Sequence, residues 1–136
     1  IMTRVSRMIR NDRHMPQNRV IDIPVAAVFS KFDAIESIVP EDFTVRRPSP
    51  HCEEGHFDMT DWHNVNSEIQ ALLNAWNATA FTSQLETNYK NYSYFAVSAL
   101  GNNPTKDGRI IDSPHPHRIE DPLLWILEEN GVIKGQ

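Results

Sequence analysis

Two polar segments, Ser30-Lys31-Phe32-Asp33 and Ser98-Ala99-Leu100-Gly101, directly follow apolar, β-branched runs that are typical of buried strands. In open α/β sheets, ligands bind just beyond the carboxyl ends of the strands. Hydroxyl, ammonium and carboxylate groups at two such ends can hydrogen-bond to a single small ligand. These two segments are therefore the positions at which ligand binding is expected.

A second group of chemically active side chains lies between residues 51 and 63 and comprises His51, Cys52, His56, Asp58 and His63. Imidazole, thiolate and carboxylate all ligate Zn²⁺, but their spacing matches no compact zinc motif. We expect polar loop residues here and predict no metal site.

Two further groups of side chains could in principle bind a ligand. His115 and His117 flank Pro116, which favours an extended surface loop over a switch or a ligand role. Among the three tryptophans, Trp76 and Trp125 sit at helical core spacing, so packing is favoured over a ligand platform. No catalytic triad or dyad can be assigned from spacing alone.

Hydrophobic periodicity and turn residues predict the elements that must position these groups. The chain begins with a helix at about 2–13 and a strand at 20–29, in which Pro24 takes an unpaired position or lies just before the ladder; a long loop or insertion with one short helical turn follows at about 35–63. A helix then starts at about 64 and is extended by Phe81 and Leu85 after a break, and it is followed by a strand at 94–98 and a polar loop at 101–118. The last helix has Asp121 as N-cap, Pro122 at its first position and Gly131 at its end, and its buried residues are Leu123, Leu124, Ile126 and Leu127.

This order of helix, strand, helix, strand and helix predicts an α/β fold, a partial three-layer sandwich around a small parallel sheet. The 136 residues suit a single domain.

The first strand and its exit, residues 23–33, resemble the strand and the Asn/Thr/Ser-Lys-x-Asp guanine motif of Ras-like (TRAFAC-type) P-loop GTPases. Ser98-Ala99-Leu100 resembles the Ser-Ala-Lys/Leu motif of the same superfamily. The resemblance covers the C-terminal half of such a domain. It implies that the guanine-binding residues are Ser30, Lys31, Asp33, Ser98, Ala99 and Leu100.

A finer resemblance covers three segments of the chain. Residues 94–101 and 119–127 resemble the end of bacterial double-GTPase-type domains, and residues 55–58 resemble their insertion after the guanine motif.

Guanine recognition explains why these residue types are needed. Guanine presents adjacent N1–H and N2–H₂ donors, and an ionised Asp33 can accept both. Adenine has an acceptor at N1, and such a mismatch can give roughly a 10⁴-fold preference. The resemblance implies that the Lys31 stem packs along the base and that the Ala99 N–H donates to guanine O6. Many family members have Asn where this chain has Ser30.

The groups that hold phosphates are absent from this sequence. It contains neither G-x-x-x-x-G-K-[ST] nor Asp-x-x-Gly. The resemblance therefore implies that GTP or GDP and Mg²⁺ are cofactors of a complete parent protein, and that this segment of it is inactive alone. The alternative is a non-catalytic interaction module on a GTPase-like scaffold.

Composition limits the remaining classes of function. The net charge of −5 and pI of about 5.6 argue against nucleic-acid binding. Cys52 is the single cysteine, and the sequence has no long apolar run, which favours a reducing, cytoplasmic setting without membrane insertion.

The way the chain begins also carries expectations. It starts at Ile1 and runs directly into an amphipathic stretch, as a segment cut from a longer protein would. In the family sheet the strand at 25–30 is internal, so we expect its edge to be exposed here and to mediate homodimerisation.

Overall fold

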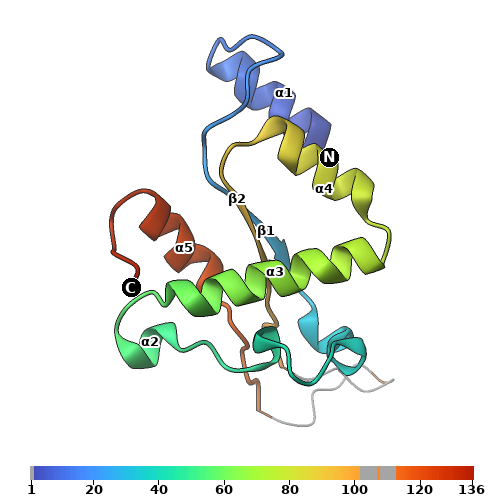
Figure 1. Ribbon diagram of the computed structural model, residues 1–136, viewed down its shortest axis with the longest axis vertical. Helices are drawn as coiled ribbons and strands as arrows, with labels where there is room; N and C mark the ends of the chain where they lie inside the picture. The colour runs from blue at the N-terminus through green and yellow to red at the C-terminus, as the bar shows by residue number, and fades with distance from the viewer. Residues whose placement is uncertain (1, 102–106, 108–112) are drawn as a thin grey trace.

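The computed structural model describes residues 2–101, 107 and 113–136 (Figure 1). Its elements, in chain order, are α1 (Met2–Asp12), β1 (Val25–Phe29), the 3₁₀ turns η1 (Phe32–Ala34), η2 (Glu36–Ile38) and η3 (Thr44–Arg46), α2 (His51–Glu54), α3 (Met59–Ala75), α4 (Thr79–Asn88), β2 (Tyr92–Ala96) and α5 (Asp121–Glu129). Residues 102–106 and 108–112 of the predicted polar loop lie outside the described residues.

Within the described residues the sheet has two parallel strands, β1 and β2. Val25 lies opposite Tyr92, and Phe29 opposite Ala96. The Val25 N–H donates to the Asn91 carbonyl, and the Phe29 carbonyl accepts the Val97 N–H, so these backbone groups face β2. The backbone groups of Pro24, Ala26 and Val28 therefore face the opposite, outer edge of β1.

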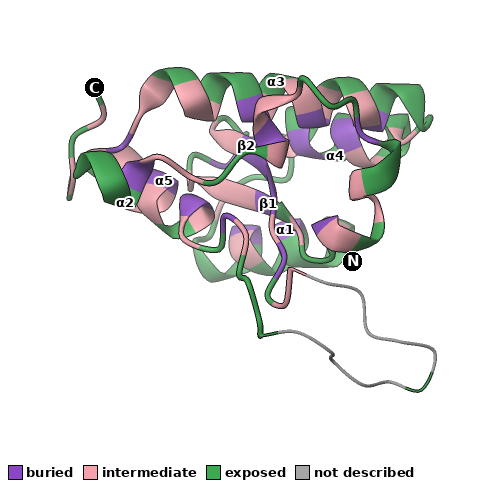
Figure 2. Cartoon of the chain, turned by 90° about the horizontal axis from the view of Figure 1, so that it is seen from below, coloured by how far each residue is buried: buried purple, intermediate pink, exposed green. Residues whose placement is uncertain are grey.

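Two hydrophobic clusters cover the two faces of this sheet. On one face Ala27 and Tyr94 pack in a large core with residues of α3 and α4. On the other face Phe95 packs against Trp125 of α5, and α5 itself lies against β1. Figure 1 shows α3 crossing the sheet and α1 beside α4. The buried residues follow the strands and the inward sides of the helices (Figure 2). The α/β prediction is thus confirmed.

The first strand is shorter than predicted, and the second has the predicted length but lies two residues earlier in the chain. The ladder starts just after Pro24, as the sequence indicated, and Ile21 forms only an isolated bridge with Tyr89. β2 ends at Ala96 because Ser98 leaves the ladder to pair with Lys31 and His117.

The helix predicted from residue 64 starts five residues earlier, so the loop predicted at 35–63 ends sooner. Asp58 caps α3 by accepting from the amides of Thr60 and Asp61 at 2.8 and 2.9 Å. The loop also holds two 3₁₀ turns, η2 and η3, and the short helix α2, where one turn was expected, and η1 directly precedes it. The predicted break before α4 is confirmed, and Asn77 there adopts a φ of 57°.

Three side chains differ from their predicted burial or role. Trp76 is 43% exposed and Leu123 is 62% exposed, so both core assignments are wrong. Asp121 is not the N-cap of α5. It is the first helical residue, and its carboxylate pairs with Arg118 instead.

Candidate functional site

The two strand exits meet at the same end of the sheet, as parallel strands require. The Phe32 N–H donates to the Val97 carbonyl at 3.0 Å, and the Val97 N–H donates to the Phe29 carbonyl at 2.8 Å. Lys31 and Ser98 form an isolated bridge across the exits. The backbone therefore fixes the separation of the two predicted motifs.

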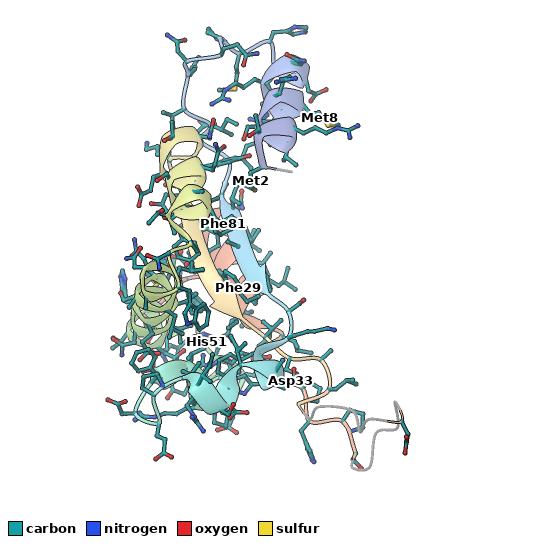
Figure 3. The ribbon with its side chains drawn as sticks, turned by 90° about the vertical axis from the view of Figure 1, so that its right-hand side faces the viewer. Met2, Met8, Phe29, Asp33, His51 and Phe81 are labelled. Atoms are coloured by element: carbon teal, nitrogen blue, oxygen red, sulfur yellow. The ribbon has the colours of Figure 1, made fainter. Side chains whose placement is uncertain are left out.

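Asp33 and Ser98, 65 residues apart, are joined by a hydrogen bond of 2.5 Å from the Ser98 hydroxyl to Asp33 Oδ1. The same hydroxyl accepts the Gly101 N–H at 2.9 Å, so its single proton is directed at Asp33. Ser98 is 2% exposed and Asp33 is half-buried. Asp33 lies beyond the end of the sheet, at the opposite end of the molecule from α1 (Figure 3).

The other predicted guanine-binding residues surround this pair. Ser30, Lys31 and Ala99 are exposed, and Leu100 is half-buried. The Leu100 carbonyl accepts the His115 N–H at 2.9 Å. The fold thus brings both motifs together around the hydrogen bond between Asp33 and Ser98.

A cleft of about 340 Å³ opens beside Asp33 and Ser98. Its walls include the carboxylates of Asp33, Glu36 and Glu120 and the imidazoles of His115 and His117. The one cationic side chain among its described lining residues, that of Arg118, is buried in ion pairs. Such walls suit a ligand that presents hydrogen-bond donors, and they disfavour a phosphate group. Ser30, Lys31, Ala99 and Leu100 do not line this cleft.

His117, predicted in an extended surface loop, is half-buried and held at three points. Its ring stacks on Phe32, with centroids 5.3 Å apart and planes 12° apart. Its Nε2–H donates to the Val45 carbonyl at 2.7 Å, because a carbonyl can only accept. Its backbone pairs with Ser98 in both directions, at 2.8 and 3.0 Å. His115 is exposed, as predicted.

Arg118 anchors the same segment from the interior and was missed by sequence reasoning. It is 2% exposed, with a φ of 52°, and Nη1 donates to Asp61 and Asp121 at 2.8 and 2.7 Å. Its Nε–H donates to the Arg47 carbonyl at 2.8 Å. Burial lowers the pKa of Arg118, but hydrogen bonds and charges from Asp61 and Asp121 outweigh burial and raise it. The only local signal in the sequence was Asp121, three residues after Arg118.

His51, predicted to be a polar loop residue, is buried, 3% exposed, beside the same carboxylates. His51, Asp61 and Asp121 are the one set of metal-type ligands that converge within the described residues. His51 Nδ1 accepts the Asp58 N–H at 3.0 Å, so the neutral ring carries its proton on Nε2, the atom 3.8 Å from each carboxylate. A protonated nitrogen cannot ligate a metal, and both carboxylates are already ion-paired with Arg118. This donor set therefore fits an internal polar network better than a metal site.

Comparisons with protein-family models, with curated proteins and with solved structures found no match. No helix among the described residues is both long enough and apolar enough to cross a bilayer.

Proposed function

We propose that this chain carries the guanine-recognition elements of a GTP-binding protein, with Asp33 as the residue that reads the base. The observation that carries the proposal is the hydrogen bond between Ser98 and Asp33 at the adjoining ends of β1 and β2. It orients a carboxylate where α/β sheets bind their ligands.

The chemistry of the cleft supports a base rather than a phosphate as the ligand at this end. Guanine offers donors at N1 and N2, which a carboxylate accepts, whereas adenine offers an acceptor at N1. The neighbouring carboxylates of Glu36 and Glu120 add negative potential that favours a donor-rich edge.

In this proposal the chain binds the base of the nucleotide, whereas residues outside this sequence bind its phosphates. Ser30, Lys31, Ala99 and Leu100 lie outside the cleft, and the resemblance alone suggests that the Lys31 stem runs along the base plane and that the Ala99 N–H reaches O6. Phosphates and Mg²⁺ would be held by a loop that is absent from these 136 residues, so no GTP hydrolysis is expected from this chain alone. We place such a protein in the cytoplasm.

The proposal is tested by titrating the chain with millimolar guanosine, adenosine and xanthosine 5′-monophosphates and following backbone amide NMR shifts. We expect GMP to bind more tightly than AMP. Asp33→Asn should weaken GMP binding by about tenfold or more, because it replaces an acceptor with a donor opposite N2. The same variant should improve the affinity for XMP relative to GMP, since xanthine has a carbonyl at C2.

Asp42→Asn is the matched control, because Asp42 is an exposed carboxylate in the segment that follows η2. It should leave all three affinities unchanged. Equal losses of GMP, AMP and XMP binding in Asp33→Asn would remove the assignment of Asp33.

A second candidate is a non-catalytic interaction module on the same scaffold. Its support is the exposure of large apolar side chains beside the sheet: Val28 is 45% exposed, Ile119 52% and Leu123 62%. Absence of any nucleotide-dependent NMR shift would favour this candidate.

A further inference from the structure

We propose that His117 is the stacking platform for the base in this cleft. The inference rests on the proposed base site and adds the residue that holds the plane of the base, which lies outside both guanine motifs.

The His117 ring is fixed before any ligand arrives. Phe32, 2% exposed, covers one of its faces in a nearly parallel stack. The hydrogen bond from Nε2–H to the Val45 carbonyl stops rotation of the ring, and the backbone pairing with Ser98 fixes its Cα. A preorganised aromatic surface binds with little loss of conformational entropy.

The stacked pair of Phe32 and His117 borders the cleft. His117 lines the cleft together with Asp33 and is half-buried. The cleft volume of about 340 Å³ falls at the lower end of the range for small-molecule sites, roughly 300–1,000 Å³. A flat ligand there can lie on an imidazole while its edge meets a carboxylate.

The two residues would contribute different properties to binding. Stacking on an aromatic face tolerates any base, because every base has a π-face. His117 should therefore supply affinity for both purines, whereas Asp33 should supply the choice of guanine.

The test measures GMP and AMP affinities of His117→Ala and His117→Phe, together with the ring-proton NMR shifts of His117 in the unmodified chain. His117→Ala should weaken both nucleotides by similar factors, about tenfold, as expected for the loss of a stacking partner. His117→Phe keeps a flat ring on Phe32 and should stay within about threefold of the original affinities. The ring protons of His117 should shift upfield as GMP is added, because they enter the ring current of the base.

His63→Ala is the matched control, since His63 is an exposed histidine on α3 that does not line the cleft. It should change neither affinity. An equal loss in His63→Ala, a loss of GMP binding alone in His117→Ala, or unshifted His117 ring protons beside a shifted Ala99 amide would each overturn the platform. The last result leaves the base site intact.

Failure of the base assignment gives a different pattern. If Asp33→Asn leaves the preference for GMP over AMP unchanged while His117→Ala weakens both, the platform stands and the guanine assignment fails. If His117→Ala does not fold, His117→Phe and the ring-proton shifts of the unmodified chain still test whether His117 is the stacking platform. Unshifted His117 ring protons at millimolar GMP would reject the platform in that case.

Discussion

Ser98 makes two hydrogen bonds with a single hydroxyl, and both concern the candidate site. It donates to Asp33 and accepts from the Gly101 amide. We predict that Ser98→Ala lowers the affinity for GMP by roughly tenfold, because Asp33 loses its orientation, and lowers the free energy of unfolding by about 1 kcal/mol. NMR titration and urea denaturation measure the two effects.

Ser93→Ala separates binding from stability in that experiment. Ser93 is fully buried and also uses its hydroxyl twice, accepting from Trp62 Nε1–H at 2.7 Å and donating to Asn66 at 3.0 Å. It lies within β2, away from the exit. A similar loss of stability with unchanged GMP affinity is expected. Reduced GMP affinity in Ser93→Ala would show that binding simply follows stability.

The burial of Tyr94 makes the stability of the folded chain depend on pH in the alkaline range. Its hydroxyl is buried and has no hydrogen-bond partner among the described residues. Burial, and secondly the charges of Tyr92 and Glu86, raise the pKa of Tyr94 from 10.0 to about 12. The folded chain therefore holds this proton more tightly than the unfolded chain, and the resulting stability is complete below pH 10 and lost as the pH rises towards 12.

Tyr94→Phe should remove that alkaline loss. At neutral pH the variant should be as stable as the original chain, or more stable by about 0.5–1 kcal/mol, because an unsatisfied hydroxyl is gone. Urea denaturation at pH 8 and pH 11 checks both statements. Tyr92→Phe, at a half-buried tyrosine, should change the pH dependence less. A steeper alkaline decline in Tyr94→Phe would contradict the argument.

At the residue scale, the placement of the Asp33 and Ser98 segments at one end of the sheet was foreseeable, because parallel strands bring their exits together. The hydrogen bond between Asp33 and Ser98 and the roles of His117 and Arg118 were not foreseeable. Arg118 bonds to carbonyls and carboxylates that lie 57 to 74 residues away along the chain. No local sequence pattern indicates such distant partners for Arg118. A histidine segment that contains and follows proline is equally typical of a surface loop.

At the element scale, periodicity located every helix with a clear apolar stripe and misplaced the start of α3. The first turn of α3 packs Met59 and Trp62 against a different cluster from the stripe that begins at Val65, so its beginning is marked by the Asp58 cap rather than by that stripe. Periodicity also assigned Leu123 to the core, although no described element covers that side of α5. A stripe predicts a buried face only where a neighbour is present.

The link between the β2 exit and the 115–117 segment depends on Gly101. Its φ is +69°, and a Cβ there would lie 2.0 Å from the His115 carbonyl oxygen. Gly101→Ala should force Leu100 and His115 apart, lower the free energy of unfolding by about 2 kcal/mol or more, and weaken GMP binding. Urea denaturation and the hydrogen-exchange rate of the His115 amide would detect this change.

Comparing Gly131→Ala with Gly101→Ala separates the loss of stability caused by the steric contact from the loss caused by the positive φ. Gly131 has the same φ of +69°, but a Cβ there would meet nothing within 4 Å. Its substitution should cost only about 1 kcal/mol and leave GMP affinity unchanged. Equal losses of unfolding free energy in the two variants would mean that the His115 backbone moves away from the new Cβ without a loss of stability.

At the scale of the whole molecule, the sheet has an open side. Within the described residues nothing pairs with the outer edge of β1, and Val25–Phe29 contains no charged residue that would discourage pairing. Pro24 lacks an N–H on that side, which limits the pairing segment to the residues after it. Val28 is one of the residues whose backbone groups face this edge, and it is 45% exposed.

We predict that the isolated 136-residue chain self-associates through this edge, with two copies of β1 antiparallel about a two-fold axis. In that arrangement Ala26 of one copy pairs with Val28 of the other, and a lysine there places two like charges beside the axis. Val28→Lys should therefore shift sedimentation velocity profiles at high protein concentration towards the monomer. Val132→Lys, at an exposed apolar residue beyond α5 that belongs to no strand, should not. A chain that stays monomeric at high concentration would mean that a five-residue edge buries too little surface to hold two copies together.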